Sequence, residues 1–145
     1  MVATALLWPL VGDRIQAAVT PDRDGCPHSS DLPSERNRAA ARAAILCLLN
    51  RHRAEHGLPP LAEDPALEAA AQAHAEDMGR RRFFAHEDPD GVGPHERIER
   101  AGFRGSTTGE NIAWGTRINA TPTRIVDGWM ASPGHRANIL RREFT

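Results

Sequence analysis

Apolar side chains recur at helical spacing in the segment that starts near residue 35. The positions that define this spacing are Ala41, Ile45, Leu48, Leu49 and His52. Repeats of three to four residues place such side chains on one face of an α-helix. The sequence then runs Gly57-Leu58-Pro59-Pro60, and a glycine followed by prolines typically ends a helix. We therefore expect a helix over residues 35–56.

A second helix is predicted over residues 64–81. Asp64 is a suitable N-cap and Pro65 suits the first helical position. The predicted inner face contains several alanines, which indicates close packing against a neighbouring element; it reads Leu67, Ala70, Ala71, His74 and Met78. On this face His74 is interpreted as a hydrogen-bonded core histidine and Met78 as core filler.

Shorter elements follow. The pattern predicts helices near residues 94–101, 122–132 and 135–140, the second of them starting at Thr121-Pro122. Residues 110–115 are apolar enough for a short buried strand. Trp129 is expected in the core, and Trp114 in the core or in the wall of a cleft.

The N-terminal segment differs from the rest of the chain. Residues 2–11 form an apolar run, too short to span a bilayer but of the length found in the apolar region of a secretory signal. No basic residues precede the run and Pro9 interrupts it, so a loosely docked tail or a misassigned start stays open. We interpret residues 1–20 as a signal peptide or its remnant, and residues 21–33, rich in Pro, Gly, Ser and Asp, as a linker.

The chain has two cysteines, one in this linker and one in the first helix. In an exported protein, Cys26 and Cys47 could form a disulfide between the linker and the helix. The alternative is a buried free Cys47 and an incidental Cys26. The leader favours export, so we predict the disulfide.

Composition narrows the function classes. The 145 residues carry a formal net charge of −1, which argues against nucleic-acid binding through bulk positive charge. All basic residues are Arg and Ala is abundant, which is typical of a GC-rich bacterial genome. The run Arg80-Arg81-Arg82 is therefore interpreted as a solvated helix end. Ser132 with His135 lacks the Gly-x-Ser-x-Gly elbow of a nucleophilic serine.

An ordered set of motifs carries a family resemblance. The motifs are Leu48-Leu49-Asn50-x-x-Arg53, His86 in an H-x-x-P-D-G loop, Gly109-Glu110-Asn111-Ile112-Ala113, and Trp129-x-x-Ser132-x-Gly134-His135-Arg136-x-Asn138-Ile139-Leu140. Together they resemble the CAP superfamily of cysteine-rich secretory proteins, antigen 5 and pathogenesis-related proteins, in its compact bacterial, SCP-like branch. The resemblance covers residues 34–145.

The resemblance implies an α/β fold, an α-β-α sandwich with a small antiparallel sheet between helical layers. In the family, further strands follow the last motif and complete the sheet. We therefore expect residues 34–145 to be a CAP domain without its C-terminal strands, with an incomplete, open-edged sheet.

The resemblance also implies a cleft. His86 and His135 correspond to its two histidines and Glu110 to a glutamate, while Ser132 stands where eukaryotic members have a second glutamate. Two neutral imidazoles can hold a divalent ion such as Zn²⁺, with a carboxylate orienting one of them. We expect His86 and His135 to face one another and to bind Zn²⁺ weakly, without a requirement for it in folding. Structural roles for each residue remain the alternative, and catalysis is not implied.

Three function classes remain open. The first is an exported protein, extracellular or in the cell envelope, whose cleft binds a lipid, a peptide or a cell-envelope fragment. The second is a metal-dependent hydrolase of peptides or wall material, which the missing carboxylate at Ser132 disfavours. The third is a structural or signalling ectodomain without a small ligand. No transmembrane span and no nucleic-acid partner are expected.

Overall fold

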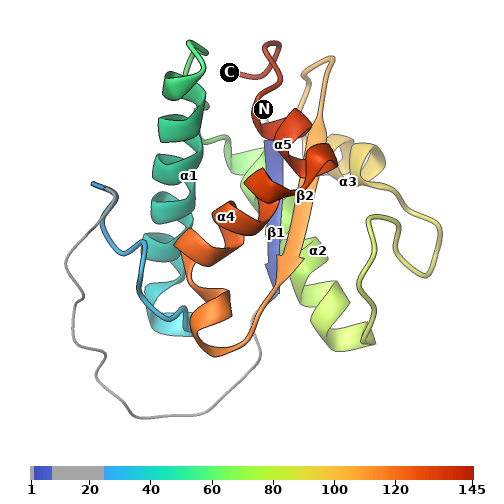
Figure 1. Ribbon diagram of the computed structural model, residues 1–145. Helices are drawn as coiled ribbons and strands as arrows, with labels where there is room; N and C mark the ends of the chain where they lie inside the picture. Colours follow the sequence, from blue (N-terminus) through green and yellow to red (C-terminus); the bar gives the residue numbers. More distant parts are fainter. Residues whose placement is uncertain (1, 8–24) are drawn as a thin grey trace.

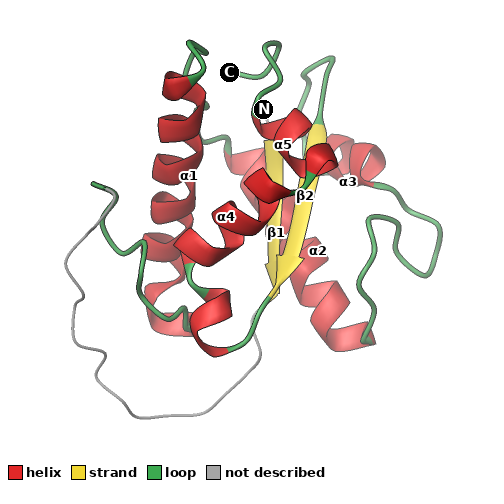
Figure 2. Cartoon of the chain, in the orientation of Figure 1, coloured by secondary structure: helices red, strands yellow, loops and turns green. Residues whose placement is uncertain are grey.

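The computed structural model describes residues 2–7 and 25–145. Helices lie on both sides of a short pair of strands (Figure 1; Figure 2). In chain order the elements are β1 (Val2–Leu7), η1 (Glu35–Asn37), α1 (Arg38–Glu55), α2 (Pro65–Arg81), α3 (Pro94–Arg100), β2 (Gly109–Trp114), η2 (Arg117–Ala120), α4 (Pro122–Ala131) and α5 (Pro133–Ile139). The predicted helices and the strand near residues 110–115 are thus confirmed, and the short η2 was not predicted.

Helix starts follow the capping residues in the sequence. Asp64 accepts hydrogen bonds from the backbone N–H groups of Ala66 and Leu67, at 2.8 and 3.1 Å, and Pro65 takes the first position of α2. Prolines also occupy the first turns of α3, α4 and α5. After α1 the chain turns at Gly57, whose φ of 64° lies in the left-handed region that favours glycine.

The sheet has two strands among the described residues. β1 pairs with β2 in parallel, in a register that runs from Val2↔Gly109 to Leu7↔Trp114. The expected antiparallel arrangement is wrong for this pair, because the strand beside β2 comes from the N-terminal segment and runs in the same direction. The sheet is incomplete, and α4 and α5 cross one of its faces while α2 lies behind the other (Figure 1).

β1 lies inside the segment interpreted as a leader. Residues 1 and 8–24 lie outside the described residues, so the leader and the first part of the predicted linker stay predictions. No helix within the described ranges is both long and apolar enough to cross a bilayer.

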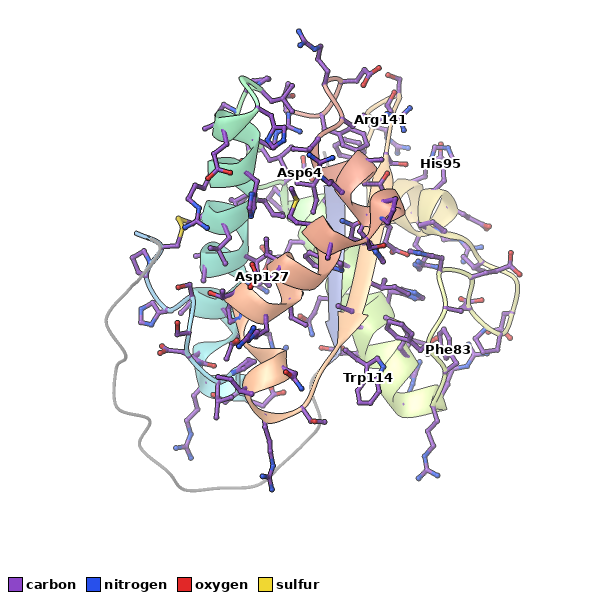
Figure 3. The ribbon with its side chains drawn as sticks, viewed as in Figure 1. Asp64, Phe83, His95, Trp114, Asp127 and Arg141 are labelled. Carbon is purple, nitrogen blue, oxygen red and sulfur yellow. A yellow bond between two sulfur atoms is a disulfide. The ribbon has the colours of Figure 1, made fainter. Side chains whose placement is uncertain are left out.

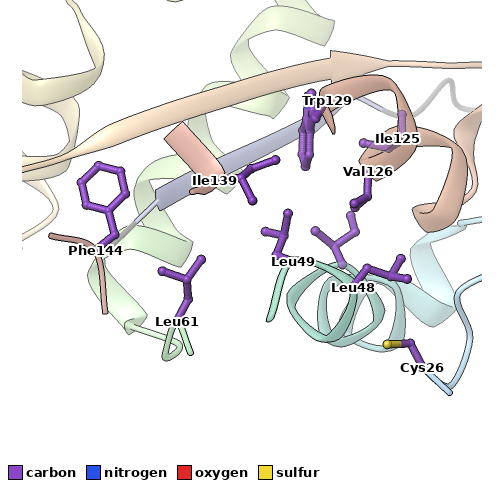
Figure 4. Packing of buried hydrophobic residues seen from close by; sticks show 10 residues of the cluster. Cys26, Leu48, Leu49, Leu61, Ile125, Val126, Trp129, Ile139 and Phe144 are labelled. Carbon is purple, nitrogen blue, oxygen red and sulfur yellow. The ribbon is translucent and has the colours of Figure 1, made fainter. Parts of the chain in front are cut away.

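The largest apolar cluster joins α1 to α4, α5 and the C-terminal residues (Figure 4). Leu48 and Leu49 pack there with Val126 and Trp129, and the indole N–H of Trp129 donates to the Ile112 carbonyl at 3.2 Å. Trp129 is thus a core residue as predicted. Trp114, by contrast, is 64% exposed at the end of β2, and Figure 3 shows its side chain at the edge of the molecule.

The predicted disulfide is confirmed. Cys26 and Cys47 are bonded, with their Cα atoms 5.7 Å apart. The Thr123 backbone N–H, at the start of α4, donates to the Ser29 carbonyl at 3.0 Å. The described part of the predicted linker is therefore attached to both α1 and α4.

Arg53 of α1 fixes the C-terminal segment. Its side chain is fully buried, and it donates to four backbone carbonyls, those of Pro59, Ile139, Arg141 and Phe144. Burial lowers the pKa of Arg53 from its ordinary value. The guanidinium thus connects α1 to the loop after it and to the residues that follow α5.

Candidate functional site

Glu110 on β2 and His86 in the loop after α2 are in direct contact. His86 Nδ1 lies 2.8 Å from Glu110 Oε1. The Glu110 side chain is 3% exposed, whereas that of His86 is 50% exposed. A carboxylate oxygen only accepts, so the contact holds the His86 ring with its Nδ1–H toward Glu110. The Nε2 atom of His86 is thereby left as the acceptor.

Arg97 on α3 neutralises the buried carboxylate. Its Nη2 lies 2.9 Å from Glu110 Oε2 and 3.1 Å from Oε1. Its Nη1 donates to the carbonyls of His86 and Val92, each at 2.8 Å. Both oxygens of Glu110 are therefore engaged, and Glu110 orients His86 while Arg97 fixes the His86 loop.

Ser132 and His135 form the second part of the site, at the start of α5. Ser132 Oγ lies 2.8 Å from His135 Nδ1. The His135 carbonyl accepts from the Asn111 side chain on β2 at 3.2 Å, and the His135 ring lies 6.5 Å from that of Trp129. These contacts fix the first turn of α5 against β2 and α4.

Two causes lower the pKa of His135. Burial lowers the pKa of His135 first, and the neighbouring His86 lowers it further. The contacts of β2 bring His86, Glu110, Ser132 and His135 into one region, because Glu110 contacts His86 and the adjacent Asn111 contacts the His135 carbonyl. That the two rings face one another across a cleft stays a prediction.

His74 lies beneath the His86 loop. It is 1% exposed, and its Nε2 lies 2.9 Å from the carbonyl of Ala85. Its Nδ1 is buried and has no hydrogen-bond partner among the described residues. Burial is the main cause that lowers the pKa of His74, with a further contribution from Arg97. The prediction of a core histidine is confirmed, but only one of its nitrogens is hydrogen-bonded within the described ranges.

His86 and His135 are the residues of the site that could hold a metal ion. In both His86 and His135 the Nδ1 atom has an oxygen partner, which leaves Nε2 as the possible ligand. A ligating histidine commonly has its second nitrogen held in this way. No group of three or more His, Cys, Asp or Glu side chains suited to a metal occurs in the part of the chain that is described.

Two features of the site were not predicted from the sequence. One is Arg97, and the other is the contact of Ser132 with His135 Nδ1. No local motif marks Arg97, because it follows His86 by 11 residues and precedes Glu110 by 13. The sequence signal that could point to Arg97 is the need of a buried carboxylate for a positively charged partner. A glutamate expected on a buried strand requires a cation, and Arg97 is one of several candidates.

Comparison with known proteins matches the chain to one family. The Cysteine-rich secretory protein family, CAP, matches residues 46–145. In Bacillus subtilis (strain 168) the chain is 37% identical over 107 residues to the uncharacterized protein YkwD and 30% identical over 116 residues to the uncharacterized membrane protein YlbC. The matches cover 74% and 80% of this chain, but only 40% and 33% of those relatives.

Two solved structures share the fold. An extracellular protein containing an SCP domain, from Bacillus anthracis str. Ames, matches with a TM-score of 0.64 and 30% identity, over 74% of this chain and 38% of its own. An outer surface protein from Borrelia burgdorferi matches with a TM-score of 0.58 over 74% of this chain and 76% of its own. At 23% identity, the second supports the fold alone.

Proposed function

Because the chain belongs to the cysteine-rich secretory protein (CAP) family, we propose that it is an exported binding protein that holds a divalent metal between His86 and His135. The ligand of the site is a lipid, a peptide or a cell-envelope fragment. Support for export comes from the disulfide and from the solved SCP-domain relative, which is described as extracellular.

The observation that carries this proposal is the pair of oriented imidazoles. Glu110 accepts from the Nδ1–H of His86, and the Ser132 hydroxyl, which can donate or accept, lies 2.8 Å from His135 Nδ1. His86 therefore presents a lone pair on Nε2, and His135 does the same in the tautomer in which the Ser132 hydroxyl accepts from Nδ1–H. A bound Zn²⁺ would supply a Lewis acid that polarises a ligand oxygen.

We propose binding rather than hydrolysis because the carboxylate of the site is already engaged. A general base needs an oxygen or nitrogen free to accept a proton from water. Arg97 contacts both oxygens of Glu110, and His86 contacts one of them. Glu110 thus acts on the ring beside it, and Ser132 supplies no second carboxylate.

Calorimetric titration with Zn²⁺ tests the proposal. We expect one site in the wild-type protein, lost in both His86→Ala and His135→Ala. His95→Ala is the matched control, since His95 is exposed on α3 and its ring pairs with Glu99. Affinity should fall as the pH drops, because a protonated imidazole cannot ligate; burial lowers the pKa of His135 and so keeps that ring neutral to a lower pH.

The outcomes separate the alternatives. Unchanged Zn²⁺ binding in His86→Ala or in His135→Ala would exclude the paired-histidine site. A wild-type protein that binds no Zn²⁺ would leave these histidines a structural role. Co-sedimentation with bacterial lipid vesicles and with purified cell-wall sacculi, each with and without Zn²⁺, then tests the ligand classes. Failure to bind either one would favour an ectodomain without a small ligand.

A further inference from the structure

We propose that His74 on α2 is a positioning residue that holds the backbone of the His86 loop, so that the His86 ring keeps one orientation. This proposal rests on the metal-binding function proposed above. His74 itself does not touch the two Nε2 atoms assigned to the ion. It acts through Ala85, the residue that immediately precedes His86.

The hydrogen bond fixes the tautomer of His74. The Ala85 carbonyl can only accept, so the 2.9 Å contact requires a proton on His74 Nε2. The Nδ1 atom then carries a lone pair, is buried, and has no partner among the described residues. A buried, unpaired acceptor destabilises a fold. The contribution of a histidine at this position is therefore its Nε2–H bond to Ala85 rather than its stabilisation of the core.

Two neighbouring carbonyls of the loop are held from two different helices. His74 of α2 binds the carbonyl of Ala85, and Arg97 of α3 binds the carbonyl of His86 at 2.8 Å. Fixing two successive carbonyls fixes the peptide between them and hence the direction in which the His86 side chain leaves the backbone. From that position His86 Nδ1 reaches Glu110.

His74 allows a cleaner test than Arg97. Substituting Arg97 would also leave the Glu110 carboxylate without its cation, because the same guanidinium contacts both groups. His74 contacts the loop through one backbone carbonyl, and its other ring neighbour is Phe83, with the centroids 5.8 Å apart. A change at His74 thus alters the loop while the Arg97–Glu110 pair stays intact.

The experiment compares His74→Leu with His74→Gln in the full chain. Leucine fills similar volume but donates no hydrogen bond, whereas glutamine carries an amide N–H at the ε position. We expect His74→Leu to weaken Zn²⁺ binding about tenfold, the lower end of the range for residues that orient a ligand, and His74→Gln to recover most of that loss. The melting temperature should not follow this order, since leucine also removes the unpaired Nδ1.

A second readout needs no metal. Long-range ¹⁵N–¹H NMR of the His86 ring reports which nitrogen carries the proton. We expect the Nδ1–H form in the wild type and in His74→Gln, and a mixture of both forms in His74→Leu. If the wild type binds no Zn²⁺ but the His86 signal changes in His74→Leu, the metal proposal fails and the positioning role stands.

An unchanged His86 signal and an unchanged Zn²⁺ affinity in a folded His74→Leu protein would overturn the positioning role. If the leucine variant does not fold, His74→Asn replaces it, because its shorter amide cannot reach Ala85. Equal Zn²⁺ affinity and equal His86 signals in the Gln and Asn variants would then overturn the proposal.

Discussion

Replacing Arg53 by methionine would remove the cation that joins α1 to the C-terminal segment. Methionine fills much of the same space but donates nothing, so the carbonyls of Pro59, Ile139, Arg141 and Phe144 lose a partner. The bonds to Ile139 and Phe144 are buried, whereas the other two are partly buried. Water can replace the guanidinium more easily at the partly buried pair.

The magnitude follows from the two buried carbonyls. Each buried, unpaired acceptor costs about 1–3 kcal/mol, which gives roughly 2–6 kcal/mol for the pair. Burial also lowers the pKa of Arg53, so removing the charge recovers part of this cost. We expect Arg53→Met to lower the free energy of unfolding by about 2–4 kcal/mol.

Urea unfolding followed by tryptophan fluorescence measures this loss, since Trp129 is buried in the cluster beside α1. With a slope of about 2 kcal/mol per molar, the midpoint should fall by about 1–2 M. Arg42→Met is the matched control on the same helix, because Arg42 makes a surface ion pair with Glu68 at 2.6 Å. That change should cost less than about 1 kcal/mol.

Arg53→Lys refines the test. The lysine ammonium is a compact group with three donors and cannot serve four carbonyls, so its loss should lie between those of the wild type and the methionine variant. An Arg53→Met protein as stable as Arg42→Met would refute the reasoning. The four carbonyls would then be hydrated without Arg53.

Two further predictions concern covalent and ionic stability. Removing the disulfide with Cys26→Ala and Cys47→Ala should lower the free energy of unfolding by about 3 kcal/mol, because the bond closes a loop with a separation of 21 residues and so limits the entropy of the unfolded chain. Urea unfolding measures this loss, and an unchanged midpoint would contradict it. Burial lowers the folded-state pKa of His74 and His135, so the unfolded chain takes up protons first as the pH falls below 6.5. Stability should therefore be complete above about pH 7 and decrease toward pH 5, by up to ~1.4 kcal/mol per pH unit for each linked proton. In urea titrations at a series of pH values, His74→Gln should make the free energy of unfolding depend less steeply on pH, and an unchanged slope would contradict this.

The helices were predictable because their ends carry local signals. Asp64-Pro65 and Thr121-Pro122 each mark a first turn, and the prolines at 94 and 133 do the same. Each signal depends on neighbouring residues alone, so no tertiary information is required.

β1 could not be predicted in the same way. A short apolar run is typical both of the central part of a secretory signal and of a buried strand. The composition of residues 2–11 does not distinguish these two possibilities. Pairing with β2 joins residues more than 100 positions apart, and no local pattern encodes such a partner. The family resemblance implied an antiparallel sheet, whereas β1 and β2 pair in parallel.

The site was predictable in part. The family motifs indicated His86, Glu110, Ser132 and His135, and the contacts of His86 with Glu110 and of Ser132 with His135 agree with the expected neighbourhood. The supporting residues were not predictable, because Arg97 and His74 act through backbone carbonyls of the loop. Any side chain with an N–H group could in principle make such contacts.

The pairing of β1 with β2 depends on the covalent link between β1 and the rest of the chain. From Cys26 onward the chain is fixed by a covalent bond to Cys47, whereas β1 is covalently joined to it only through residues 8–24. A covalent tether gives a paired strand an effective concentration on the order of millimolar. A cut anywhere in residues 8–24 would turn β1 into a separate peptide, whose occupancy beside β2 depends on its free concentration. Dilution alone would then empty the place beside β2, and the edge that carries Glu110 would become available to another strand.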